Sequence, residues 1–309
     1  MRTPHDQLGE LYPFESHWFE IDGLRMHYVD EGTGEAVVMV HGNPTWSFFF
    51  RELIKALRGE RRVIAPDHIG CGFSDKPPDA RYEYVLERRV SDLETLLDHL
   101  ELHRDVTLVV HDWGGMIGLA CALRKPERIA RIVLLNTAAF LLPKGKRLPW
   151  RLAFLRHVPL LPALLVRGFN VFASGATRMA TVPLLSREVR RAYTLPYDSW
   201  ANRIATLRFV QDIPLTPSDV SYALAREVDD QLSALSEVPM LICWGMRDFV
   251  FDAQFLEEWR RRFPRARVHK FENAGHYVLE DARDAVIDAT RKFIEQNPIR
   301  VGDVVREAS

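Results

Sequence analysis

The sequence predicts an α/β fold, in which a mostly parallel sheet is covered by helices on both faces. Three observations predict it. Short runs rich in β-branched residues alternate with longer helical patterns, and several of the short runs are continuously apolar, as expected of strands buried on both faces. The alternation stops at about residue 139 and resumes near residue 239. A strand–helix rhythm of this kind gives parallel strands, and its interruption indicates a helical insertion.

The predicted strands begin with two period-two runs joined by a hairpin at Asp22-Gly23. The eight expected strands cover residues 16–21, 24–30, 36–40, 62–65, 106–110, 129–135, 239–244 and 268–271. The helices expected between or after them cover residues 48–57, 85–102, 114–124, 255–263 and 285–293. The longest of these helical patterns, residues 85–102, carries a leucine stripe on one face.

The segment from residue 140 to residue 217 lacks strand–helix alternation and is interrupted repeatedly by prolines. Short helices are expected between the prolines. We therefore expect an eight-stranded sheet with a helical cap inserted after the sixth strand. The core would comprise residues 1–138 and 218–309, and the cap residues 139–217.

Composition excludes several classes of function. Lysine and arginine total 41 and aspartate and glutamate 42, and this balance argues against a dedicated nucleic-acid-binding protein. The three cysteines, Cys71, Cys121 and Cys243, are far apart, which disfavours disulfides and metal clusters, and no metal or cofactor motif is visible. The N-terminus shows no signal peptide, and no apolar run approaches the length of a membrane span, so we expect a cytoplasmic protein.

The strongest motif is an apolar strand that runs into a sharp turn at His111-Asp112-Trp113, followed at once by Gly114 and Gly115 and a helix. This layout is typical of a nucleophile elbow, in which the turn exposes one side chain above the carboxyl edge of the sheet. Asp112 occupies the nucleophile position. A carboxylate is ionised at neutral pH and can attack a carbon atom without a base to activate it. The alternative is a helix N-cap, because aspartate is common there.

Two later residues complete a catalytic set. His276 follows the last predicted strand in a glycine-containing loop and could deprotonate a hydrolytic water. Asp248 follows the preceding strand and could accept a hydrogen bond from this histidine. The strand before that one ends at Leu135-Asn136-Thr137 without a carboxylate, which favours Asp248 as the acid.

Asn43 and Trp113 are the candidate donors that stabilise an oxyanion or a leaving group. Asn43 follows the third strand and Trp113 follows the nucleophile, and backbone N–H groups at these positions form the oxyanion hole in this kind of fold. The side chains of both residues are also hydrogen-bond donors. For Asn43 the alternative is an ordinary turn residue before Pro44.

Taken together, these motifs resemble those of the haloalkane dehalogenase family of α/β-hydrolases, and the match covers the whole chain outside the cap. The motifs are His41 to Trp46, Asp67 to Pro77, His111 to Gly115, Gly245 to Asp248 and Ala274 to His276. The pairing of Asn43 and Trp113 with an aspartate after the seventh strand is similar to the third subfamily, which includes the β-lactone decarboxylases of bacterial long-chain olefin biosynthesis. The cap motifs at residues 136–140 and 197–214 resemble the latter enzymes.

The resemblance implies that a cis-3-alkyl-4-alkyloxetan-2-one is converted to a cis-alkene and CO2, with Asp112 as nucleophile and without a cofactor. Haloalkane dehalogenation is the alternative. Epoxide hydrolysis, with Tyr193 and Tyr197 as proton donors, and an inactive binding module are further alternatives. Trp46, Phe140 and Trp200 are expected to line the substrate pocket.

The expected partner is a small hydrophobic substrate. The resemblance also implies assembly with other enzymes of olefin biosynthesis. Arginines among the apolar residues of the cap leave membrane association open, although Pro159 and Pro162 interrupt any long amphipathic helix.

Overall fold

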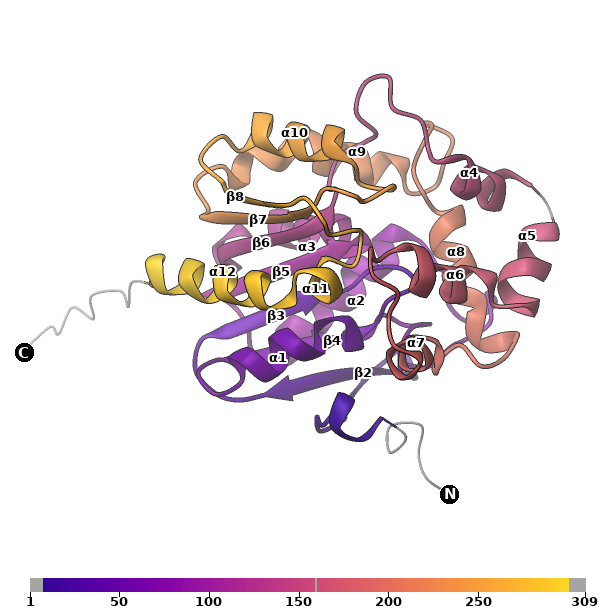
Figure 1. Ribbon diagram of the computed structural model, residues 1–309, viewed down its shortest axis with the longest axis horizontal. Helices are drawn as coiled ribbons and strands as arrows, with labels where there is room; N and C mark the ends of the chain where they lie inside the picture. Colours follow the sequence, from indigo (N-terminus) through magenta and orange to yellow (C-terminus); the bar gives the residue numbers. More distant parts are fainter. Residues whose placement is uncertain (1–7, 159, 300–309) are drawn as a thin grey trace, which may run out of the picture.

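The computed structural model describes residues 8–158 and 160–299, which form an α/β-hydrolase fold around an eight-stranded sheet (Figure 1). The strand order is β1-β2-β4-β3-β5-β6-β7-β8, and every pairing from β4 to β8 is parallel. The strands are β1 His17–Ile21, β2 Leu24–Glu31, β3 Ala36–Val40, β4 Arg62–Pro66, β5 Val106–Asp112, β6 Ile129–Thr137, β7 Met240–Gly245 and β8 Arg267–Phe271. The predicted fold class is thus confirmed.

The two antiparallel edge strands arise from the predicted hairpin. Asp22 and Gly23 both have positive φ angles, of 50° and 70°, which is the geometry of the two-residue turn that matches the twist of the strands. β2 then pairs with β4, so the hairpin extends the parallel part of the sheet on one side.

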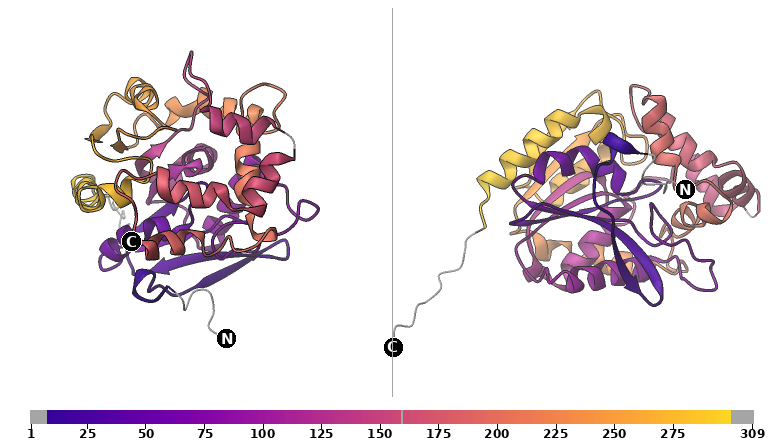
Figure 2. Two further views of the ribbon diagram at one scale, coloured as in Figure 1. Left: turned by 45° about the vertical axis from the view of Figure 1, so that its right-hand side comes forward. Right: turned by 90° about the horizontal axis from the view of Figure 1, so that it is seen from below.

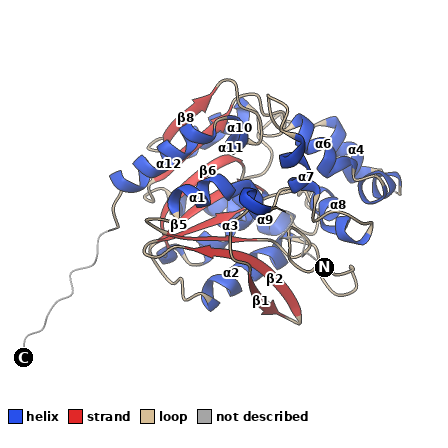
Figure 3. Ribbon diagram, turned by 60° about the horizontal axis from the view of Figure 1, so that its bottom comes forward, coloured by secondary structure: helices blue, strands red, loops and turns tan. Residues whose placement is uncertain are grey.

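Helices cover both faces of the sheet (Figure 3). The helices of the core are α1 Arg51–Leu57, α2 Leu86–His99, α3 Trp113–Arg124, α9 Tyr222–Gln231, α10 Ala253–Arg262, α11 Val278–Asp281 and α12 Arg283–Gln296. Apolar residues of α2, α3, α9 and α10 form one hydrophobic cluster, and those of α1, α11 and α12 contribute to another. Alternate residues of β3 enter opposite clusters, because successive side chains of a strand point to opposite faces.

Residues 139–217, which we call the cap segment, contain helices but no strand in their described part. These helices are α4 Trp150–His157, α5 Leu161–Ala163, α6 Val171–Met179, α7 Arg187–Thr194 and α8 Ile204–Gln211, with helical turns at Leu164–Gly168 and Ala201–Arg203. They form one end of the molecule, opposite the end of α12 (Figures 1 and 2). Our division of the chain at residues 138/139 and 217/218 stays a proposal.

Helix α9 is the main element that the sequence pattern did not predict. It lies between the cap segment and β7 and buries only Ala225 and Val228 on its apolar side. With only two buried positions, the hydrophobic periodicity of this segment is too weak to predict a helix. Packing of α9 against α2 and α3 stabilises it instead. No helix of the described residues is long and apolar enough to span a membrane.

Candidate active site

Asp112 lies at a strained turn between β5 and α3. Its φ and ψ angles are 52° and −126°, a backbone conformation that costs free energy in a residue other than glycine. Asp112 occupies the N-cap position of α3, but its carboxylate makes no side-chain capping hydrogen bond to the helix, so it does not stabilise α3 in that way. Instead, Asp112 Oδ1 accepts a hydrogen bond of 2.6 Å from the backbone N–H of Asn43. The turn therefore presents the carboxylate to the space above the sheet.

Glycines make this turn possible because backbones and side chains approach closely around it. A Cβ atom at Gly42 would lie 2.0 Å from Asp112 Oδ1, and one at Gly114 would lie 2.0 Å from the carbonyl oxygen of Val40. Val110, two positions before Asp112, packs toward Gly118 of α3, where a Cβ would meet Val110 Cγ1 at 2.8 Å. The missing side chain of Gly118 thus makes room for Val110 against α3.

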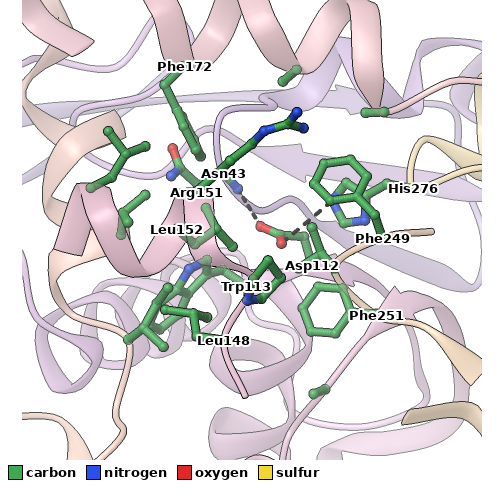
Figure 4. Close-up of a pocket in the computed structure, with 18 of the residues that line it drawn as sticks. Asn43, Asp112, Trp113, Leu148, Arg151, Leu152, Phe172, Phe249, Phe251 and His276 are labelled. Atoms are coloured by element: carbon green, nitrogen blue, oxygen red, sulfur yellow. Dashed lines mark hydrogen bonds and ion pairs between the residues drawn. The ribbon is translucent and has the colours of Figure 1, made fainter. Parts of the chain in front are cut away.

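His276 and Asp248 lie beside Asp112 at the carboxyl edge of the sheet. His276 Nδ1 lies 2.8 Å from Asp248 Oδ2, and His276 Nε2 lies 3.6 Å from Asp112 Oδ2. All three side chains are almost fully buried. Figure 4 shows the Asp112 carboxylate between Asn43 and His276. In this geometry, Asp248 can fix the orientation of the His276 ring, while Nε2 of that ring faces Asp112.

Burial and neighbouring charges shift the pKa values of Asp112 and His276. Burial raises the pKa of Asp112 above the ordinary value of an aspartate, although His276 and the backbone N–H groups of Asn43 and Trp113 offset part of this shift. Burial opposes protonation of His276, but the carboxylates of Asp248 and Asp112 outweigh it, so the pKa of His276 is raised. The imidazole therefore holds a proton more readily than an isolated histidine.

Asn136 and His111 are two site residues that sequence reasoning did not assign. Asn136 Nδ2 donates hydrogen bonds of 3.0 Å to both Asp248 Oδ2 and the carbonyl oxygen of Gly245. His111 stacks on Phe49 and lies 3.0 Å through Nε2 from the carbonyl oxygen of His276. Asn136 lies where β6 ends. A polar residue at the carboxyl end of a buried strand was the one sequence feature that could have predicted its place in the site.

Asn43 and Trp113 both lie next to Asp112, but their side chains are oriented differently. Asn43 Nδ2 donates a hydrogen bond of 3.0 Å to the carbonyl oxygen of Thr206 in α8, which leaves one amide hydrogen for a ligand. The Trp113 ring packs against Phe209 of α8 at 5.4 Å, with the Arg89 guanidinium 5.9 Å away. Both side chains therefore bridge the core and the cap segment.

A cavity of about 350 Å³ lies between the cap segment and the sheet and reaches Asn43, Asp112, Trp113 and His276. Its other walls are mainly aromatic and aliphatic, as Figure 4 shows. They include Leu148, Leu152, Phe172, Phe249 and Phe251. This volume falls within the range of roughly 300–1,000 Å³ that is common for small-molecule sites.

Of the three expected pocket aromatics, Phe140 belongs to the cavity wall, whereas Trp46 and Trp200 are not among the lining residues. Trp46 is fully buried among Tyr12, Phe48 and Phe73, because the turn after β3 directs it into the core. Trp200 lies on the outer surface, about half exposed.

The two cap tyrosines also lie outside the cavity wall. The hydroxyl group of Tyr193 donates to Glu280 Oε1 at 2.5 Å, and that of Tyr197 donates to the carbonyl oxygen of Thr45 at 3.4 Å. Both tyrosines are fully buried. This placement removes the proton donors on which the epoxide hydrolase alternative depended. The described residues also contain no cluster of three or more His, Cys, Asp or Glu side chains that could hold a metal ion.

The fold and the elbow define a class of protein, and comparison with known proteins agrees: the chain belongs to the α/β-hydrolase fold family, whose model matches residues 35–282. More particularly, it is 52% identical over 290 residues to a cis-3-alkyl-4-alkyloxetan-2-one decarboxylase of Shewanella oneidensis, covering 94% of this chain and 91% of the relative. A decarboxylase of the same name from Xanthomonas campestris pv. campestris is 47% identical, with 90% and 94% of the two chains covered.

A solved structure with the same fold is the haloalkane dehalogenase DatA from Agrobacterium tumefaciens C58. Its TM-score is 0.84 at 25% sequence identity, and the match covers 96% of this chain and 100% of that one. The family resemblance inferred from the motifs is thus confirmed. These relatives are all named as enzymes, either decarboxylases or a dehalogenase.

Proposed function

We propose that this protein decarboxylates cis-3-alkyl-4-alkyloxetan-2-ones to cis-alkenes, with Asp112 as the nucleophile. One observation carries the proposal: a buried carboxylate, ionisable and paired with a histidine, stands at the end of a cavity whose walls are otherwise mainly apolar. A dialkyl β-lactone has the matching chemistry, since its strained polar ring suits the carboxylate and its two alkyl chains suit the walls. The similarity to decarboxylases over nearly the whole chain supports the same reaction.

The reaction breaks one C–O bond and one C–C bond of the ring, forms the C=C bond and releases CO2, so no water is consumed. We propose that Asp112 opens the ring and is regenerated as the alkene leaves. The free amide hydrogen of Asn43 and the indole N–H of Trp113 would hold the lactone oxygens during this step. His276, oriented by Asp248, would balance the charge that moves on and off Asp112.

The test is incubation of the purified protein with a synthetic cis-3,4-dialkyl β-lactone, followed by gas chromatography of the alkene with cool injection. The Asp112→Ala variant serves as the control for thermal loss of CO2. We expect cis-alkene only with the unchanged protein. Intact lactone with the active-site carboxylate present would contradict the proposal.

Haloalkane dehalogenation is the second candidate, because the same carboxylate could displace a halide from an sp³ carbon. The structural likeness to DatA favours keeping it. That reaction consumes water and needs His276 as a base for cleavage of the ester on Asp112. Release of bromide from 1-bromoalkanes without alkene formation from the lactone would favour this candidate. Assembly with other olefin-pathway enzymes and a cytoplasmic location stay predictions.

A further inference from the structure

The cap segment is strongly basic although the whole chain is nearly neutral. Residues 139–217 contain twelve lysines and arginines but only three carboxylates, whereas the chain as a whole has a net charge of −1. Three of these cations are neutralised by carboxylates that lie outside or at the border of the cap segment, through the pairs Lys146–Asp252, Arg156–Asp219 and Arg208–Asp79. Within the described residues, Arg147, Arg151, Arg178, Arg187 and Arg191 are exposed and make no ion pair.

The same segment carries most of the exposed large apolar side chains. Of thirteen such residues in the described chain, ten lie between residues 150 and 200. Leu160, Trp150 and Phe169 protrude most, with exposed fractions of 88%, 74% and 69%. A folded protein rarely exposes so many large apolar side chains in one region unless that region contacts something apolar.

Five of these exposed side chains lie on or next to α5, the helical turn after it and the segment that Arg167 contacts, and we call them the cap tip: Leu160, Leu161, Leu164, Phe169 and Trp200. The first four lie within residues 160–169, around α5 and the helical turn that follows it. Arg167 joins them to Trp200, because its guanidinium lies 4.7 Å from the tryptophan ring and its Nε donates to the Trp200 carbonyl oxygen. Figure 2, left, looks toward this end of the molecule.

The cavity that Asp112 lines reaches the surface at α4 and α6, two helices that contact α5 or the turn after it. Trp150 is largely exposed and also lines the cavity, as do the exposed residues Arg151, Val171 and Met179. Arg151 Nη1 lies 3.5 Å from Met179 Sδ, so α4 and α6 meet at this opening. Apolar side chains and unpaired cations thus surround the entrance to the site.

We propose that the cap segment docks on the surface of a bilayer containing anionic lipids, with the cap tip inserted among the acyl chains. Aromatic and aliphatic side chains that protrude between arginines match a surface in which anionic headgroups cover a hydrocarbon layer. A protein partner would have to supply both an apolar surface and a large excess of carboxylates. Docking itself does not depend on the proposed reaction, but if that reaction holds, the entrance would face the phase in which dialkyl lactones dissolve.

The test is flotation of the full-length protein with vesicles of phosphatidylcholine alone or with about 30 mol% phosphatidylglycerol. We expect binding to the anionic vesicles, little binding to the neutral ones, and loss of binding when salt rises to about 0.5 M. The double variant Leu160→Ser/Phe169→Ser should bind about tenfold more weakly, because it removes inserted side chains without opening the core. The triple variant Arg178→Gln/Arg187→Gln/Arg191→Gln should weaken binding to anionic vesicles only.

Matched controls lie outside the cap segment. Val220→Ser removes an apolar side chain that is 80% exposed, and Arg81→Gln removes an exposed cation that makes no ion pair in the described chain; both should leave vesicle binding unchanged. Absence of binding to anionic vesicles would overturn the proposal, as would equal binding to neutral ones. Concentration-dependent self-association that the Leu160→Ser/Phe169→Ser variant abolishes would assign the surface to a second copy of the chain and also overturn it. Lactone turnover in detergent without vesicle binding would separate failure of docking from failure of the proposed function.

Discussion

Asp112 combines two unfavourable features that its surroundings maintain. It is a carboxylate with 7% exposure, and its backbone is held at a positive φ angle. The backbone N–H of Asn43 and the nearby His276 stabilise its charged form, but burial still raises its pKa. A desolvated carboxylate is a stronger nucleophile than a hydrated one, so the environment that raises the pKa also favours attack.

This pKa shift predicts the pH dependence of activity. In the proposed reaction only ionised Asp112 attacks, and its raised pKa means that protonation begins at a higher pH than for an ordinary aspartate. Activity should therefore be lost as pH falls, with the acid limb of kcat/KM above the ordinary range of about 4. Because a dialkyl lactone has no titratable group, the profile of kcat/KM reports the free enzyme. An acid limb at or below the ordinary aspartate value would contradict this assignment.

Asn136 is predicted to act as a positioning residue through Asp248. Asn136→Ala removes a hydrogen bond to a charged group, which contributes about 1.5–3 kcal/mol, so kcat should fall roughly tenfold or more. KM should change little, because Asn136 does not line the cavity. Steady-state kinetics with urea unfolding would separate this effect from general destabilisation. Asn202→Ala, which removes a bond to the exposed Asp198, is the control, and an Asn136→Ala enzyme as active as the control would reject the assignment.

At the scale of elements, the site depends on how closely β5, α3 and β3 approach one another. The turn at Asp112 places the first residues of α3 directly against the end of β3. Gly114 lies against the Val40 carbonyl group, which belongs to the backbone of the central sheet and cannot rotate away. Glycine at this position is therefore a requirement of packing between elements.

Gly114→Ala should consequently destabilise the protein by about 3 kcal/mol or more, because either α3 or β3 must move. Gly175→Ala is the matched control. It lies in α6, its added Cβ would meet Met179 Cε at 3.7 Å, which is an ordinary contact, and a gain of up to about 1 kcal/mol in stability from helix propensity is expected. Urea unfolding of both variants checks the prediction. Equal midpoints for the two variants would show that the elbow tolerates a side chain.

At the scale of the whole molecule, a buried ion pair of the core holds a tyrosine of the cap segment. Arg51 of α1 forms two hydrogen bonds with Glu280 of α11, at 2.5 and 2.8 Å, and Tyr193 of α7 donates to the same carboxylate. Arg51 and Glu280 are both largely shielded from solvent. The network fixes α7 relative to the loop that carries His276.

Arg51→Ala should destabilise the protein by about 3 kcal/mol, because it leaves Glu280 buried without its cation. Arg261→Ala, which breaks an ion pair on the surface of α10, should change stability far less, because solvent screens that pair. Thermal unfolding at one pH compares the two. A similar loss of stability in both variants would show that the buried pair contributes no more to stability than a surface ion pair.

The sequence by itself determined the strand–helix rhythm, the position of the cap segment between β6 and β7, and the placement of Asp112, Asp248 and His276 after parallel strands. These features follow from periodicity and from turn residues, which are local properties of the chain. Only the tertiary structure decided that Asn136 holds Asp248, that Trp46 turns into the core and Trp200 to the surface, and that Tyr193 serves a buried ion pair. The physical reason is that such roles depend on which side chain fills the space between elements distant in sequence, and no local pattern encodes that choice.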